Sequence, residues 1–164
     1  MNKSSRFLVV GLIAILLLAG CGGAKLGTEN NPIVWAFVPS GETEKVTTGA
    51  NELSALLEDE TGYVFDILVT TENAGAIEAM CSDPPEAQMS SLNTFSYVLA
   101  NERCGVETEL VASRYGSPTY NGQIIVNVDS GISAIQDLKG KTFCRPDPLS
   151  TSGWIIPDLT MRAA

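Results

Sequence analysis

A run of three hydroxyl residues is the part of the sequence whose types and spacing point most directly to chemistry. Ser150-Thr151-Ser152 is preceded by Asp147-Pro148 and followed by Gly153, between a predicted strand and a predicted helix. Free backbone N–H groups and the positive end of the helix dipole favour an anion at such a helix start, and each hydroxyl adds a donor. Spacing alone favours plain helix capping by these residues. The alternative hypothesis is an oxyanion site. It is not a P-loop, because no Lys follows Gly153.

Catalysis is a poor fit to this composition. The chain contains no histidine, the commonest general base and metal ligand. A serine nucleophile at Ser150 or Ser152 also has no lysine three residues further on. No pair of cysteines has the C-x-x-C spacing of a zinc or redox site. We therefore expect a protein that is not an enzyme and needs neither a metal nor another cofactor.

The N-terminus indicates export and lipidation. Two basic residues, Lys3 and Arg6, precede an apolar run over residues 7–18, which is too short to span a membrane. Leu18-Ala19-Gly20-Cys21 then matches a lipobox, in which the cysteine thiol receives a diacylglyceryl group. We expect a signal peptide over 1–20, a lipid on Cys21, a flexible Gly-rich tether over 21–31 and an extracytoplasmic, membrane-anchored domain. An ordinary signal peptide with a chance cysteine is the alternative.

The charge of the chain excludes some partners. The net charge is −9, and removal of the signal peptide leaves 8 basic against 19 acidic residues, or −11. Such an acidic chain is a poor binder of nucleic acid or anionic lipid surfaces. At physiological salt, repulsion between an anion and charges more than roughly 8 Å away is screened. Dipoles that point at the anion from closer range are not screened, so the acidic chain can still bind an anion.

Strands and helices alternate along the rest of the chain. Apolar or β-branched runs predict strands at 33–38, 63–69, 87–90 and 109–113, with helices between them. Residues 115–122 look like a linker. Beyond it we expect strands at 123–128 and 141–144, a short helix at 133–138 and a last helix from about Ser150. The alternation predicts an α/β fold with a parallel sheet, and the absence of closing elements predicts that the chain is a fragment.

Three cysteines follow Cys21, and export permits disulfides. Cys81 and Cys104 flank one strand–helix unit, so they form a candidate disulfide. We expect Cys144 to pair with a residue outside this chain.

Several short stretches, in this order, resemble the solute-binding proteins of phosphate, phosphite and phosphonate ABC transporters. The most specific of them is the last stretch, DP with STSG, which follows DLKGK. The matching stretches are VPSGE (38–42), LE and TG within 57–62, AGAIEAM (74–80), SYVLA (96–100), DSGI (129–132), DLKGK (137–141), and DP with STSG within 147–153.

The resemblance implies a periplasmic binding protein of type 2 that closes two lobes on its ligand. Lobe one is expected at 32–114, a hinge crossover at 115–122, and the truncated start of lobe two at 123–164. The ligand is expected to be a phosphonate, phosphite or phosphate, delivered to an ABC transporter permease. A sensory or surface lipoprotein that uses the same fold for another small anion is the alternative.

The resemblance also assigns ligand contacts. Ser150, Thr151 and Ser152 match the residues that bind the phosphonyl oxygens, and Tyr97 matches a lobe-one ligand tyrosine, although spacing alone also fits a packing role. Asn73 stands where the family commonly has a second tyrosine, which changes the reach of that side chain. Ser40, on a strand-end turn that faces the expected cleft, is a further candidate contact.

Overall fold

The computed structural model of the chain describes residues 23–38 and 41–164. The predicted signal peptide, the predicted lipidation site Cys21 and the candidate contact Ser40 lie outside the described residues. Within the described part, no helix is both long and apolar enough to cross a membrane. Residues 24–31, which fall in the predicted tether, form a turn in which Gly27 accepts a hydrogen bond from the N–H of Val64 (2.9 Å).

A three-stranded parallel sheet forms the centre of residues 33–104, which fall in the predicted lobe one. β1 (Ile33–Phe37) lies between β2 (Phe65–Val69) and β3 (Met89–Ser91), so the strand order is β2-β1-β3. The central strand places Trp35 opposite both Ile67 and Met89. The predicted α/β fold with a parallel sheet is therefore confirmed.

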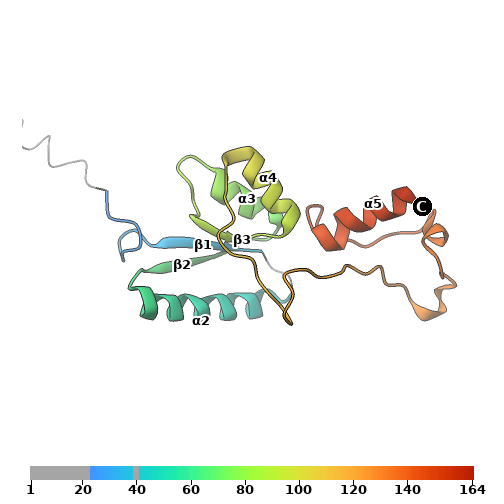
Figure 1. Cartoon of the computed structure of the whole chain (residues 1–164), viewed down its shortest axis with the longest axis horizontal. Helices are drawn as coiled ribbons and strands as arrows, with labels where there is room; N and C mark the ends of the chain where they lie inside the picture. Colours follow the sequence, from blue (N-terminus) through green and yellow to red (C-terminus); the bar gives the residue numbers. More distant parts are fainter. Residues whose placement is uncertain (1–22, 39–40) are drawn as a thin grey trace, which may run out of the picture.

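Helices cover both faces of this sheet. α2 (Thr43–Thr61) lies on one face, while α3 (Asn73–Cys81) and α4 (Thr94–Cys104) lie together on the other (Figure 1). The chain leaves α2 through Gly62 at φ 70°, a left-handed conformation that glycine adopts without strain. Small residues let α3 approach the sheet closely, because Ala36, Ala79 and Ala87 form the buried core.

A disulfide joins the last residues of α3 and α4. Cys81 and Cys104 are bonded, with their Cα atoms 5.5 Å apart. Cys144 is exposed and has no disulfide partner in the described part of the chain.

Beyond α4 the chain is extended and returns through short helical turns. η1 (Val128–Ser130) and η2 (Ile135–Leu138) are single turns, and η3 (Thr151–Ile155) leads into α5 (Ile156–Ala163). Figure 1 shows this segment running away from the sheet and returning, so that η3 lies beside α4.

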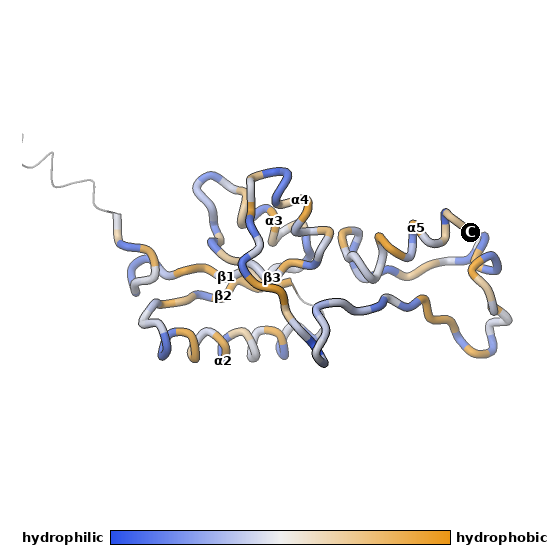
Figure 2. The backbone as a smooth tube through the Cα atoms, viewed as in Figure 1, coloured by the Kyte–Doolittle hydropathy of each residue, from blue (hydrophilic) through white to orange (hydrophobic). Residues whose placement is uncertain are grey.

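Three predicted strands, at 109–113, 123–128 and 141–144, are wrong, and the predicted helix at 133–138 is only the 3₁₀ turn η2. The composition favours strands, but a strand needs a neighbour to take up its backbone hydrogen bonds. In the described residues these segments find none, although Figure 2 shows apolar stretches along this part of the chain. The exposed fractions of Leu110 (91%), Ile125 (82%) and Val128 (93%) show that such side chains stay in solvent.

Candidate functional site

The carboxyl edge of the parallel sheet is where polar groups of the two following helix starts gather. β1 connects to β2 on one side and the chain then returns to β3 on the other, which makes this edge a topological switch point. Crevices at such points are the usual ligand sites of open α/β sheets. The loops after β2 and β3 lead directly into α3 and α4, so the N-termini of both helices meet there.

Asparagines organise these two helix starts. Asn93 caps α4, because its Oδ1 accepts the N–H of Ser96 (3.1 Å). The buried Asn73 begins α3, and its Oδ1 accepts from Asn93 Nδ2 (2.6 Å) and from the Ser96 hydroxyl (3.2 Å). The network fixes the two helix starts relative to each other.

The hydroxyl turn predicted from the sequence is a capped helix start. Ser150 is the N-cap of η3, and its Oγ accepts the N–H of Gly153 (3.2 Å). A side chain at position 153 would not fit, since a Cβ there would lie 2.5 Å from Cγ of Pro146 and 2.8 Å from the Ser150 hydroxyl. Glycine is therefore required for this turn to close.

This turn packs on the start of α4. The Thr151 hydroxyl donates to Asn93 Oδ1 (2.7 Å) and accepts the N–H of Phe95 (2.8 Å). The structure thus brings together Thr151 and Asn73, two of the predicted site residues, through the shared partner Asn93. Tyr97 is half-buried on the first turns of the same helix.

The hydroxyls of the turn differ in what they have left to donate. A hydroxyl carries one hydrogen and two acceptor positions. In the described structure, Ser150 and Ser152 accept hydrogen bonds, from Gly153 and from the Tyr120 hydroxyl (3.4 Å), and donate none. Thr151 already uses its hydrogen on Asn93. Ser150 and Ser152 are therefore the hydroxyls ready to donate to an anion.

Asp147 is a charged residue at the start of this turn, where its carbonyl accepts the N–H of Ser150 (3.2 Å). Its Oδ2 accepts the N–H of Asn73 (3.0 Å) and its Oδ1 accepts the N–H of Leu149 (2.6 Å). Burial acts to raise the pKa of Asp147, but the hydrogen bonds from Asn73 and Leu149, with help from nearby Arg145, lower it. A depressed pKa means that this carboxylate stabilises the fold above its unfolded pKa, and that the stabilisation is lost as the pH falls through the folded value.

Aromatic residues line the far side of the turn. Trp154 packs beside Phe143, with ring centroids 5.7 Å apart, and the guanidinium of Arg145 lies 4.6 Å from the centre of the indole. No group of three His, Cys, Asp or Glu side chains that could hold a metal ion occurs within the residues that the structure describes.

Sequence reasoning missed Asn93, Ser96 and Tyr120 as parts of this site. Asn93 carries a local signal, because Asn is a typical helix N-cap residue, but its contact with Thr151 spans 58 positions. Nothing local in the sequence identifies such a partner.

Two comparisons with known proteins bear on this geometry. The model of a family described as "ABC transporter, phosphonate, periplasmic substrate-binding protein" matches residues 35–164. The chain is also similar to the phosphate-import protein PhnD of Mycolicibacterium smegmatis (strain ATCC 700084 / mc(2)155), with 26% identity over 152 residues. That match covers 87% of this chain and 47% of the relative, so the chain spans about half the length of the curated relative.

Proposed function

Because the chain belongs to the family of periplasmic substrate-binding proteins of phosphonate ABC transporters, we propose that it captures a phosphonate, phosphite or phosphate and delivers it to an ABC importer. Members of such a family bind a substrate for transport and are not enzymes. The PhnD relative is a phosphate-import protein, which supports an oxyanion as cargo.

The observation that carries this proposal is the position of the hydroxyl turn. Ser150 and Ser152 have hydrogens left to donate, and the turn is docked beside the N-termini of α3 and α4. Helix N-termini and neutral hydroxyls suit an oxyanion at close range, even in a protein of net charge −9. A hydrogen bond to a charged group contributes roughly 1.5–3 kcal/mol, so a few of them support micromolar affinity.

The proposed ligand contacts follow from this placement. Ser150 and Ser152 donate to the oxyanion, and Thr151 holds the turn in place through its hydrogen bonds with Asn93 and Phe95. Tyr97, Asn73 and Ser40 are further proposed contacts that rest on the family resemblance, and Ser40 lies outside the described residues. The proposed lobes are 32–114 and 123 onward, joined by the crossover at 115–122.

Calorimetry on the full-length protein tests the cargo. We expect saturable, one-to-one heats with at least one of methylphosphonate, phosphite and phosphate, at a dissociation constant of about 1 μM. Chloride at the same ionic strength is the control for a non-specific anion effect. Absence of heat with all three oxyanions would refute the ligand assignment.

We also propose that Cys21 carries a lipid that holds the mature protein at the membrane. A Cys21→Ser variant is expected to lose incorporation of a labelled fatty acid and to move from the membrane fraction to the soluble fraction, because a serine hydroxyl does not receive the diacylglyceryl group. Cys144→Ser is the matched control, since Cys144 is exposed but lacks a lipobox. If the Cys21→Ser protein still incorporated label, the anchor would lie elsewhere.

A further inference from the structure

Asp147 connects the hydroxyl turn to lobe one across a long stretch of sequence. One carboxylate oxygen accepts the N–H of Leu149, two residues away, and the other accepts the N–H of Asn73, 74 residues away. The first bond shapes the turn that leads to Ser150. The second bond fastens that shaped turn to the first residue of α3.

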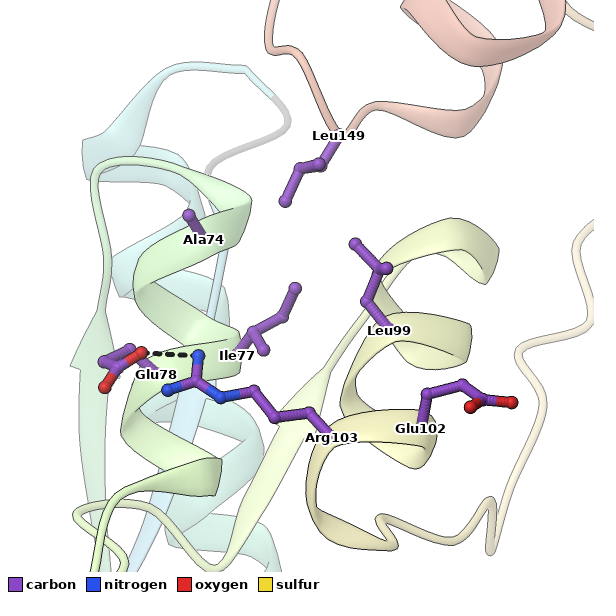
Figure 3. Close-up of a pocket in the computed structure, with 7 residues that line it drawn as sticks. All are labelled: Ala74, Ile77, Glu78, Leu99, Glu102, Arg103 and Leu149. Atoms are coloured by element: carbon purple, nitrogen blue, oxygen red, sulfur yellow. Dashed lines mark ion pairs between the residues drawn. The ribbon is translucent and has the colours of Figure 1, made fainter.

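An apolar contact supports the same connection. Leu149 points into an open pocket of about 460 Å³ between α3 and α4, toward Ala74, Ile77 and Leu99 (Figure 3). The Glu78–Arg103 ion pair (2.6 Å) borders the same pocket further down the helices. The residue that donates to Asp147 is therefore also seated on lobe one by its side chain.

The charge of Asp147 is compatible with a nearby anion only because of these bonds. A bare carboxylate beside an oxyanion would repel it. Here each oxygen faces a backbone N–H, and the start of α3 adds the positive end of a helix dipole. The negative charge is compensated by lobe one and by the turn itself.

From these contacts we propose that Asp147 is a positioning residue, which holds the Ser150–Ser152 turn against lobe one so that the serine hydroxyls meet the ligand. The proposal rests on the proposed function. Asp147 needs no contact with the ligand, because it acts through the two backbone N–H groups. Thr151 provides the second attachment of the turn, on Asn93 and Phe95.

Asp147→Asn is the sharpest variant, because it preserves the shape but removes the charge and one of the two acceptor oxygens. We expect the amide proton signals of Asn73 and Leu149 to move upfield in NMR spectra without ligand. We also expect oxyanion affinity to fall about tenfold by calorimetry, which is the effect of losing one charge-assisted hydrogen bond. Asp147→Glu keeps the charge and should recover part of that affinity.

The control is Asp137→Asn. Asp137 also accepts two backbone N–H groups, from Ser133 and Ala134, but both are local and belong to the turn before η2. The Asp137→Asn variant should therefore leave oxyanion affinity unchanged. Equal affinity of wild type and Asp147→Asn, or unmoved Asn73 and Leu149 signals, would overturn the proposal.

Hydrogen exchange on the wild-type protein tests the attachment even if the variant does not fold. The Asn73 and Leu149 amides should be protected without ligand, and exchange at the rate of free amides would overturn the proposal. A wild-type protein that shows both protected amides but no heat with any oxyanion would instead refute the proposed function.

Discussion

Replacing Ser150 and Ser152 together with alanine is expected to weaken oxyanion binding by at least about 100-fold. Each serine has a hydrogen that the described structure leaves undonated, and each is placed on a turn docked at the carboxyl edge of the sheet. A hydrogen bond to a charged acceptor contributes roughly 1.5–3 kcal/mol, and every 1.4 kcal/mol is about tenfold in affinity. Calorimetry with the tightest of the tested oxyanions measures the loss.

Ser150 needs a separate control because it also caps η3. Removing its Oγ leaves the N–H of Gly153 without this acceptor and costs about 1 kcal/mol of stability, independently of any ligand. Ser152 caps nothing, so Ser152→Ala alone should lower affinity at least tenfold without lowering the melting temperature. Ser133→Ala is the control. Ser133 lies in the turn before η2, where its hydroxyl bonds only to Asp137, so ligand affinity should not change. Unchanged affinity in the double variant would remove the turn from the binding site.

The sheet and helices of residues 33–104 were predictable because their sequence signals are local. An apolar run at 33–38 corresponds to β1, and Thr61-Gly62 marks the end of α2, where Gly62 adopts its left-handed conformation. Asn93, a typical N-cap residue, likewise stands directly before the first residue of α4. Each of these elements then finds a packing partner, since β1 pairs with both β2 and β3, so the local pattern and the final packing agree.

The strands predicted beyond residue 105 do not form in the described structure, because a strand needs a partner and the local sequence pattern does not show whether one is present. Val111 and Val126 lie in segments with the composition of strands, yet 66% and 44% of their surfaces are exposed. β-propensity describes how well a side chain fits a paired and half-buried surface. Without a partner strand the same residues remain extended and unpaired.

The candidate site was predictable in part. The helix start at Ser150 could be recognised from residue types, because hydroxyls before a helix are capping residues whatever else they do. The contacts that dock this turn could not, since Thr151 meets Asn93 across 58 positions and Asp147 meets Asn73 across 74. Such contacts depend on how the residues beyond 115 fold back over the helices of residues 33–104. A single sequence contains no pattern that predicts contacts between residues so far apart along the chain.

Removing the Cys81–Cys104 disulfide is expected to destabilise the protein by about 3 kcal/mol. The bond closes a loop with a sequence separation of 23, and a loop of that size restricts the unfolded chain by about this amount. A Cys81→Ala, Cys104→Ala double variant should therefore melt about 10 °C lower, as followed by circular dichroism. A melting temperature equal to that of the wild type would contradict the prediction.

The same variant should bind oxyanions almost as well as the wild type at a temperature where both are folded. The disulfide joins the C-terminal ends of α3 and α4, whereas the site is built on their N-terminal ends, at Asn73 and Asn93. Cys144→Ala is the matched control and should not change binding, because this cysteine is exposed and lies outside the α3–α4 pair. A large loss of affinity in the double variant at low temperature would contradict this expectation. It would mean that α3 and α4 move when the disulfide is removed, and that the disulfide holds the starts of both helices in position for the hydroxyl turn.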